Sequence, residues 1–314
     1  MAKAIEQLRS GLTIGHFGLG LHGSAVGSVR QQVHDGDTIN VRAAGNFGVR
    51  FLGVDTPEIS FTLPGPVQRF TPISDVRWQA FLSDPFAAQY PPLALSLGLT
   101  SYLQAQLGPA AAANHYFHAL AAQRALEDEI IKDLSELGQT PEAFQFFVAF
   151  ASEVMDRYGR LLGYVNRHQD TGPRPLDYNG RLLQAGRANP YFIWPNINPF
   201  RKQQSLRDSV PPPNSANTIA NREATLRQAR EWVQNARQQE TGVFDANDPL
   251  KLQAFELRFL AQRRAPNRWL IDLSKNDDVL IHPQEYYTVP HVEDRLFIPE
   301  EYLPLFEEVG WRRQ

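Results

Sequence analysis

Cysteine is absent from this chain of 314 residues, and no hydrophobic run reaches the length of about 20 residues that a membrane-spanning helix needs. The lack of cysteine excludes disulfide bonds and thiolate metal ligands. It leaves the compartment open, because a cysteine-free chain suits reducing and oxidising surroundings alike. Residues 1–30 do not resemble a secretory signal, since Glu6 and Arg9 come early and glycines and histidines interrupt the following stretch. We therefore expect a cytoplasmic protein without a membrane partner, with secretion as the open alternative.

The chain also lacks an overall basic charge. Its net charge is −3, which by itself disfavours binding to nucleic acid. The charges are segregated, however: residues 147–207 contain nine basic and four acidic side chains, a balance of +5. Residues 59–146 contain four basic and eight acidic side chains, a balance of −4. The basic segment therefore offers a local surface for an anion, with ordinary scatter of charge as the alternative.

Residues 33–54 have the pattern of β-strands. Polar and apolar residues alternate over residues 38–42, a turn follows, and residues 47–54 form a nearly continuous apolar run typical of a buried strand. The sequence Asp-Thr-Pro-Glu at residues 55–58 ends this run. Two further apolar segments, residues 144–150 and 161–165, also predict strands.

Residues 59–140, by contrast, predict helices and few strands. Short helices are expected over residues 75–82 and 93–106, and a long helix begins after Gly108-Pro109 and ends at Gly138. Its apolar residues recur at helical spacing and predict a stripe that faces the core, made of Phe117, Leu120, Ile130, Ile131, Leu134 and Leu137. Toward the C-terminus we expect a turn and short helix at 176–188, a proline-rich linker at 209–217, helices at 221–239 and 250–262, and short strands at 269–271 and 279–281.

Two acidic clusters flank one arginine. The first is His-Asp-Gly-Asp-Thr at residues 34–38, and the second, at residues 55–58, follows shortly after Arg50. Arg50 lies inside an apolar strand, where a guanidinium is costly unless an anion pairs with it. Carboxylates at opposite ends of a hairpin can converge on a hard cation, which prefers oxygen ligands. Arg50 therefore has two kinds of candidate partner, these carboxylates and a substrate phosphate.

A second arginine enters through the sequence Asp-Arg-Tyr-Gly-Arg at residues 156–160, in which a glycine turn delivers Arg160 to the start of a strand. Carboxylates for a metal, one carboxylate for a base and two arginines are sufficient for hydrolysis of a phosphodiester. The transition state places additional negative charge on the phosphoryl oxygens, and a cation with two forks of N–H donors stabilises it.

These segments resemble the staphylococcal nuclease (thermonuclease) family. The resemblance rests on three separated motifs in one order, residues 33–38, 50–58 and 156–160. It covers about residues 33–58 and 144–200, and residues 221–239 match the C-terminal helix of that family more loosely. It implies an α+β fold built on a five-stranded barrel of the OB type.

The resemblance also implies one calcium site. Asp37 and Asp55 would bind the ion together with the backbone carbonyl of Thr56. Asp35 and Thr38 would support the site from the first acidic cluster. This ligand set contains no histidine or cysteine, which disfavours zinc, and calcium tolerates an irregular, water-rich shell of oxygen ligands.

The same resemblance assigns the catalytic groups. Glu58 would be the general base that activates the attacking water, and Arg50 and Arg160 would hold the phosphate. Further contacts to the substrate are expected from three residues: Arg157, Tyr158 and Tyr191. The family's pair of tyrosines near the base is only partly matched, because the candidates after Tyr191 are Ile193 and Trp194.

The chain is longer than the minimal family fold. Residues 59–140 would be a helical insertion, and the helical and irregular segment at residues 246–314 a C-terminal extension. The expected organisation is an N-terminal segment (1–30), a nuclease-like barrel (31–208) interrupted by the insertion, a linker with the C-terminal helix of the fold (209–245), and the extension.

Two other patterns leave alternatives open. His115 and His118 could share a helix face and bind a metal, but no third ligand is evident, and partly exposed surface histidines are the simpler interpretation. Tyr191, Phe192 and Trp194 could stack on nucleobases, or they could pack beneath the C-terminal extension.

The sequence thus predicts a calcium-dependent nuclease that acts on DNA, RNA or both with little sequence preference. By resemblance, its products would carry 3′-phosphate and 5′-hydroxyl ends. One alternative is a nucleic-acid-binding scaffold of the same fold, and another is a nuclease gated by its insertion.

Overall fold

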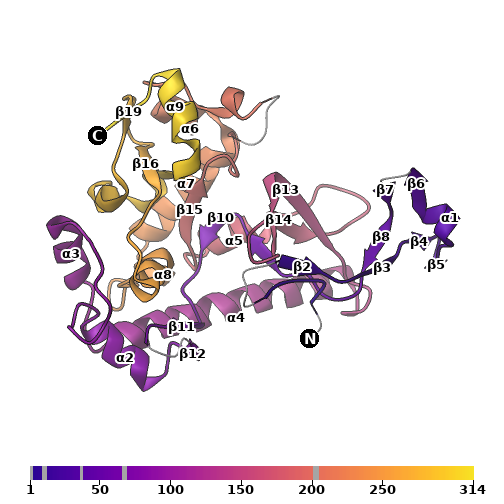
Figure 1. Ribbon diagram of the computed structural model, residues 1–314, viewed down its shortest axis with the longest axis horizontal. Coiled ribbons are helices and arrows are strands. Elements are labelled where there is room, and N and C mark those ends of the chain that lie inside the picture. The colour runs from indigo at the N-terminus through magenta and orange to yellow at the C-terminus, as the bar shows by residue number, and fades with distance from the viewer. Residues whose placement is uncertain (1–2, 9–12, 36–37, 66–68, 201–204) are drawn as a thin grey trace. The chain divides into compact units, whose positions relative to one another are not determined.

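The computed structural model describes residues 3–8, 13–35, 38–65, 69–200 and 205–314 (Figure 1). The chain divides into two compact units. The small unit comprises Met1–Phe51 and Ala149–Gly163, and the large unit comprises Leu52–Val148 and Tyr164–Gln314. Within the described ranges, none of the helices has the length and apolar character that crossing a membrane requires.

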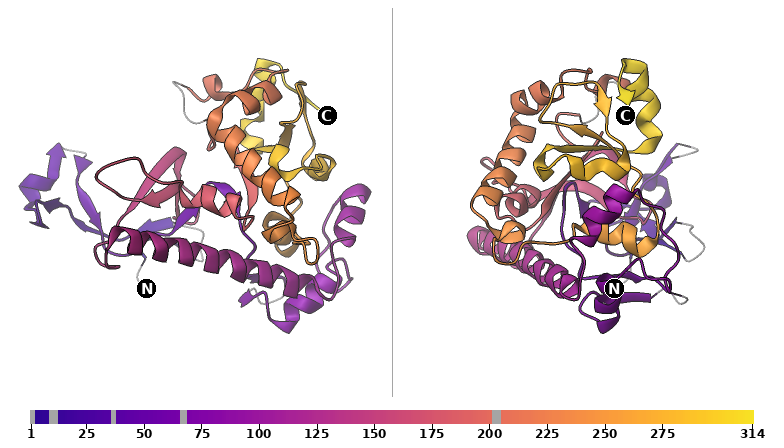
Figure 2. Two further views of the ribbon diagram at one scale, coloured as in Figure 1. Left: turned by 180° about the vertical axis from the view of Figure 1, so that it is seen from behind. Right: turned by 90° about the vertical axis from the view of Figure 1, so that its left-hand side faces the viewer.

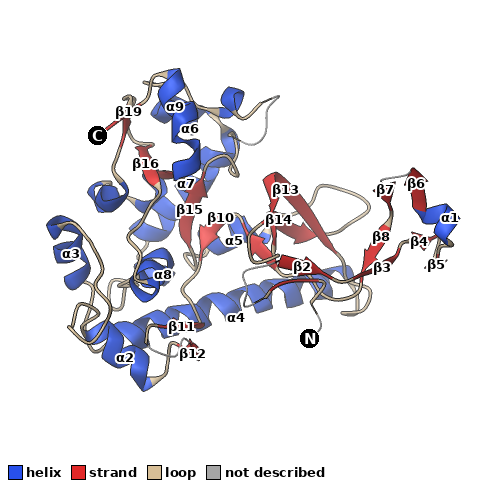
Figure 3. Cartoon of the chain, in the orientation of Figure 1, coloured by secondary structure: helices blue, strands red, loops and turns tan. Residues whose placement is uncertain are grey.

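The small unit consists largely of short paired strands (Figure 3). These pairs are β1 (Ile5–Gln7) with β2 (Thr13–Gly15), β3 (Phe17–Leu19) with β8 (Val41–Ala43), β4 (Leu21–His22) with β5 (Ala25–Val26), and β6 (Val33–Asp35) with β7 (Thr38–Ile39). One turn of helix, α1 (Val29–Gln32), precedes β6. Because each strand has only two or three residues, these strand pairs leave many apolar side chains exposed, Val26 of β5 being 55% exposed.

A three-stranded sheet contains Arg50, and the turn with Arg160 connects two of its strands. Its central strand is β14 (Leu161–Arg167), with β13 (Phe146–Met155) on one side and β9 (Val49–Phe51) on the other. The strands β9 and β14 run parallel, and Arg50 is paired in register with Leu162. Arg50 therefore lies on β9, and Arg160 lies in the turn directly before the neighbouring strand β14.

The large unit is built around a four-stranded sheet in the order β10-β15-β18-β16. The strands β10 (Gly53–Asp55) and β15 (Asn189–Ile193) are antiparallel, whereas β15 and β18 (Arg295–Ile298) are parallel. The strand β16 (Trp269–Asp272) pairs antiparallel with β18 and forms one edge of the sheet. Thus two strands from the last 50 residues extend the sheet that ends in Asp55. A hairpin, β11 (Ser60–Leu63) with β12 (Arg69–Pro72), and a small pair, β17 (Val279–Leu280) with β19 (Arg312–Arg313), complete the strands of this unit.

Helices make up much of the rest of the large unit. They are α2 (Val76–Ser83), α3 (Leu97–Gln104), α4 (Ala111–Leu137), α5 (Tyr178–Gln184), α6 (Ala216–Arg222), α7 (Ala224–Gln238), α8 (Ala254–Gln262) and α9 (Leu303–Val309). Single turns of 3-10 helix occur at Arg207–Ser209, Gly242–Phe244, Val292–Asp294 and Glu300–Tyr302, and a longer one at Pro283–Thr288. The helix α5 contacts both α4 and α7, as the view from behind shows (Figure 2).

The α+β class is confirmed, but the described strands form open sheets and close into no barrel. The helices expected near residues 75–82, 108–137, 221–239 and 250–262 are present as α2, α4, α7 and α8. Local signals placed them correctly: the Asp75 side chain accepts a hydrogen bond from the Arg77 N–H at the start of α2, and Gly138 ends α4 in a left-handed conformation. The hairpin β11–β12 within the expected helical insertion was not predicted.

The predicted core stripe of α4 is wrong. Phe117 and Ile131, two of its members, are 58% and 62% exposed. The buried face of this helix instead carries small and polar residues: Ala111, Ala112, Asn114, His115, His118, Ala119, Ala122 and Asp133. Small side chains allow a close approach of the neighbouring chain, and the buried polar groups find partners there.

Candidate active site

Asp55 is the last residue of β10 and is almost fully buried, with 2% of its side chain exposed. Its two carboxylate oxygens accept hydrogen bonds from Arg258 of α8, Oδ1 from Nη1 at 3.0 Å and Oδ2 from Nη2 at 2.8 Å. This is a two-pronged contact between a guanidinium and a carboxylate, which is the strongest geometry such a pair adopts. The predicted metal ligand Asp55 thus already faces a cation that comes from another part of the chain.

The same arginine also binds the predicted base. Arg258 Nη1 donates to Glu58 Oε1 at 2.8 Å, so that one guanidinium bridges both carboxylates. Burial alone would lower the pKa of Arg258, but the adjacent Asp55 and Glu58 carboxylates outweigh it and raise that pKa above its ordinary value. Arg258 is therefore a permanent positive charge between the two acidic groups.

The backbone of Glu58 is fixed by the helix α4. Its N–H donates to His115 Nε2 at 2.8 Å. Because Nε2 accepts, the proton of the neutral ring is on Nδ1, which donates to the Leu252 carbonyl at 3.1 Å. Complete burial lowers the pKa of His115 to about 3, which keeps this ring neutral near pH 7.

The expectation that His115 and His118 are surface histidines is therefore wrong. Both are buried, and His118 Nε2 lies 2.8 Å from the Asp248 carbonyl. Each ring connects α4 to the segment at residues 248–252, ahead of α8. The sequence could not separate a buried histidine from an exposed one, because the partners of these rings are backbone groups 57 to 137 residues away.

The sequence Asp-Arg-Tyr-Gly-Arg at residues 156–160 forms a tight turn between β13 and β14 in the small unit. The Asp156 carboxylate accepts hydrogen bonds from the Tyr158 N–H at 2.9 Å, from the Arg160 N–H at 3.0 Å and from Arg160 Nε at 2.7 Å. Gly159 has a φ of 78°, and a Cβ there would lie 2.4 Å from Ile5 Cγ2, so this position requires glycine. The turn holds Arg160 on the surface with 44% of its side chain exposed.

An aromatic ring lies between two arginines in this turn. Arg157 Cζ is 4.8 Å and Arg160 Cζ is 5.4 Å from the centre of the Tyr158 ring, and Arg157 Nη2 donates to the Tyr158 hydroxyl at 2.6 Å. Tyr158 is 43% exposed. An exposed ring flanked by guanidinium groups is suited to contact a base and its phosphates together.

The predicted site residues are distributed over both units. Asp55, Thr56 and Glu58 belong to the large unit, together with Tyr191. Arg50, Arg157, Tyr158 and Arg160 belong to the small unit, and Arg50 is half-buried on β9. Thr38 is exposed at the start of β7 of the small unit. Asp37 lies outside the described residues, and of Asp35 only the backbone, in β6, is described.

Tyr191, Phe192 and Trp194 pack against the C-terminal extension, the second of the two roles considered for them. Tyr191 is 8% exposed and stacks on Phe255 with ring centres 5.6 Å apart, and its hydroxyl accepts a hydrogen bond from Arg268. Trp194 is fully buried against Tyr302 and Phe306. These contacts join β15 to the segments that follow residue 250.

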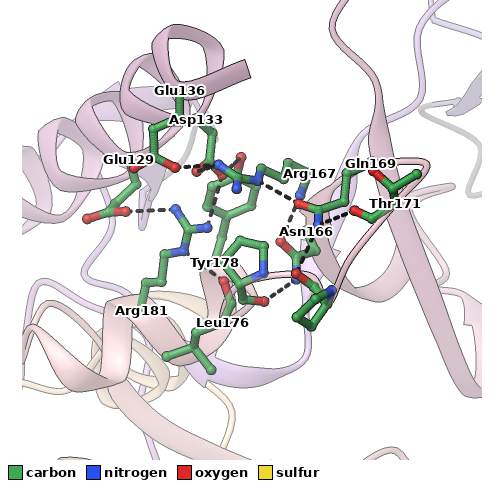
Figure 4. Close-up of polar contacts among 12 residues, drawn as sticks. Glu129, Asp133, Glu136, Asn166, Arg167, Gln169, Thr171, Leu176, Tyr178 and Arg181 are labelled. Atoms are coloured by element: carbon green, nitrogen blue, oxygen red, sulfur yellow. Dashed lines mark hydrogen bonds and ion pairs between the residues drawn. The ribbon is translucent and has the colours of Figure 1, made fainter.

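Part of the basic segment is neutralised internally, which corrects its interpretation as an anion surface. Arg167 and Arg181 both pair with Asp133 of α4, a carboxylate that is 1% exposed, at 3.0 Å each (Figure 4). Arg181 also pairs with Glu129 and Arg167 with Glu136, while the Tyr178 hydroxyl donates to Asp133 at 2.8 Å. The acidic and basic segments of the sequence are therefore partners within the large unit, and the segregated charge partly reflects this pairing.

The described residues do not complete a metal site as they stand. They contain no group of three or more histidine, aspartate or glutamate side chains that could hold a metal ion. The carboxylates of Asp55 and Glu58 are suitable oxygen donors for a hard cation. Their oxygens are, however, bonded to the guanidinium of Arg258.

Arg258 is the residue of this candidate site that the sequence patterns did not indicate. Its helix has the sequence Ala-Phe-Glu-Leu-Arg-Phe-Leu-Ala-Gln, in which Glu256 and Arg258 are the charged residues. Charged residues in a short apolar helix are the available signal, because they must find partners when the helix is buried. The identity of those partners, about 200 residues earlier, is set by the tertiary fold.

Comparison with known proteins gives one distant similarity. Over 150 residues the chain is 28% identical to Endonuclease YhcR from Bacillus subtilis (strain 168). The matched stretch covers 48% of this chain and 10% of the relative, so the chain spans about a tenth of the relative's length. No protein-family model matches the chain, and no solved structure matches it. The chain is therefore similar, over about half its length, to a protein named as an endonuclease.

Proposed function

We propose that this protein is a metal-dependent nuclease that hydrolyses phosphodiester bonds of DNA, RNA or both with little sequence preference. The observation that carries the proposal is the convergence of Asp55 and Glu58 on one cation, Arg258. Two carboxylates held together in this way are a ready site for positive charge. The similarity to a protein named Endonuclease YhcR supports the same reaction class.

Each side chain then has a role. Asp55 would bind one calcium ion together with Asp37 and the Thr56 carbonyl, while Asp35 and Thr38 support them. The ion would neutralise the negative charge that develops on the phosphoryl oxygens. Binding of the ion in this way requires Asp55 to be released from Arg258.

The remaining roles need no metal contact. Glu58 would remove a proton from the attacking water, and its backbone bond to His115 keeps it at the end of β10. Arg50 on β9 and Arg160, in the turn directly before the neighbouring strand β14, would hold the phosphate. Arg157 and Tyr158 would contact the adjacent nucleotide. We further propose that the three-stranded sheet β13-β14-β9 is part of a barrel of the OB type.

The test is to digest an end-labelled oligonucleotide with calcium and, separately, with magnesium, and to identify the new termini. We expect cleavage in calcium that leaves 5′-hydroxyl and 3′-phosphate ends. Strong activity in magnesium with 5′-phosphate products would contradict the calcium assignment and the proposed departure of the 5′-oxygen. It would leave the nuclease function intact.

A second candidate is a nucleic-acid-binding scaffold with no cleavage. It is favoured by one observation, the bonding of both catalytic carboxylates to Arg258. The same digestion separates the two functions when single-stranded and double-stranded DNA and RNA are all tested. Binding to all four without any cleavage in calcium would establish the scaffold.

A further inference from the structure

The guanidinium of Arg258 lies where the proposed function needs a metal ion. It donates three hydrogen bonds of 2.8–3.0 Å, two to Asp55 and one to Glu58. Both oxygens of Asp55 are used. A divalent cation and the guanidinium cannot bind the same oxygens at the same time, because both need to approach the lone pairs directly and they repel each other. Occupancy by one therefore excludes the other.

Arg258 is presented by a firmly anchored helix. Leu257, Phe259 and Leu260 of α8 are buried in the core of the large unit. The Glu256 side chain also accepts a hydrogen bond from the Gln253 N–H and fixes the start of the helix. The backbone of α8 is thus held in place independently of Arg258.

The side chain of Arg258, by contrast, is partly exposed to solvent. It is 20% exposed, whereas Asp55 is 2% exposed, so the guanidinium forms the outer member of the pair. Its Cζ lies 6.0 Å from the centre of the Tyr191 ring, which borders it on one side. A rotation of a long, flexible side chain on a fixed helix can therefore open the carboxylates without unfolding the unit.

We propose, on the basis of the proposed function, that Arg258 is an internal latch: it holds Asp55 and Glu58 in a resting state and must leave them before a divalent cation can bind. Gating thus resides in helix α8 of the C-terminal extension, and the insertion contributes the fixed contact from His115 to the Glu58 backbone. Removing the latch raises the affinity for the metal, because the ion no longer displaces a bound cation.

The test measures calcium binding by titration calorimetry for the full chain and for Arg258→Gln. The latch predicts that Arg258→Gln binds calcium about tenfold more tightly than the original protein, a coupling of ordinary size for two ligands that exclude each other. Arg230→Gln is the matched control, since Arg230 of α7 forms a comparable pair with Asp294 at 2.6 Å away from this site. It is expected to bind calcium as the original protein does.

A second variant covers the case in which Arg258→Gln does not fold because two acidic groups are left facing each other. Arg258→Lys keeps the charge and loses the two-pronged contact, so it is expected to give an intermediate calcium affinity. If both Arg258 variants bind calcium as tightly as the original protein or more weakly, the latch is overturned.

Cleavage assays on the same proteins separate this outcome from failure of the proposed function. Cleavage by the original protein with unchanged affinity in the Arg258 variants would reject the latch and keep the nuclease. The predicted order of affinities without cleavage by any variant would keep the latch and reject the nuclease.

Discussion

The two units of the molecule support their functional residues in different ways. The large unit has a deep core in which Trp78, Phe81 and Leu270 are completely buried. The small unit consists of short hairpins, and its apolar residues Val26 and Ile39 are more than half exposed. The carboxylates of the proposed site belong to the large unit, and its arginines belong to the small unit.

The site residues of the two units differ in how strongly a substitution should affect stability. Asp55 and Glu58 are part of a buried network with Arg258 and His115, in which each group satisfies another. Arg160 is held by a turn and is exposed. A change to a buried, mutually bonded group alters stability and chemistry together, whereas a change to an exposed group alters chemistry alone. Substitutions in the two units should therefore differ in kind.

The largest effect is expected from Glu58→Gln. Glutamine keeps the size and the backbone bond to His115 but cannot accept a proton from water, so cleavage should fall by about 100- to 10,000-fold. Binding of nucleic acid should change little, because the arginines remain. The measurement is the single-turnover cleavage rate alongside an equilibrium binding assay. Cleavage at the original rate would exclude Glu58 as the base.

The second largest effect is expected in the free energy of unfolding, which should differ between a variant of the large unit and a variant of the small unit. Asp55→Ala leaves the partly buried Arg258 with one carboxylate in place of two and should lower the free energy of unfolding by about 3 kcal/mol. Arg160→Ala removes an exposed pair and should change it by less than about 0.5 kcal/mol. Urea denaturation of both variants measures the contrast. Equal losses would show that the two halves of the site do not differ in their support.

Arg160 should, however, matter for the reaction. Arg160→Ala is expected to slow cleavage by about 100-fold through loss of charge stabilisation on the phosphate. Arg160→Lys should restore little of this, because a lysine cannot form the two-pronged contact. The readout is the cleavage rate at saturating substrate. Full activity of the lysine variant would reduce the role of Arg160 to that of a simple positive charge.

The smallest effect concerns pH and tests the neutral His115. The pKa of its ring is about 3 in the folded protein against 6.5 ordinarily, so protons bind the unfolded chain preferentially in between. Its contribution to stability is complete above pH 6.5 and is lost as the pH falls from 6.5 toward 3. His115→Gln retains an acceptor for the Glu58 N–H and does not titrate.

Thermal denaturation as a function of pH checks this point. At pH 7.5 the glutamine variant should be less stable by about 1 kcal/mol, because the bond to the Leu252 carbonyl is weakened. The difference should shrink to zero at about pH 6 and reverse by about pH 5, because the original protein loses about 1.4 kcal/mol per pH unit below 6.5. A gap that stays constant over this range would contradict a neutral, buried His115.

The sequence predicted those features that depend on neighbouring residues. The start of a helix near residue 75, the stop at Gly138 and the turn at residues 156–160 each depend on groups within a few positions of one another, and all are present. Local hydrogen bonding thus accounts for the elements that were placed correctly.

Features set by distant contacts were missed. The hydrophobic pattern of α4 pointed to Phe117 and Ile131, whereas its buried face is occupied by Asn114, His115 and Asp133. The hydrogen-bond partners of these three side chains are distant in the sequence. The same holds for Arg258, whose role depends on carboxylates about 200 residues away. Periodicity reports which side chains are apolar, but it cannot report which polar side chains will find a buried partner.

The anchoring of α4 at both ends bears on how this protein would respond to a protease. Near its start, Asn114, His115 and His118 bond to residues 248–252. Near its end, Asp133 forms ion pairs with Arg167 and Arg181 (Figure 4). Nicking the exposed connections on either side of this helix would cut the chain without freeing the fragment. A nicked preparation should therefore migrate as one particle in a native gel and separate into pieces only in detergent.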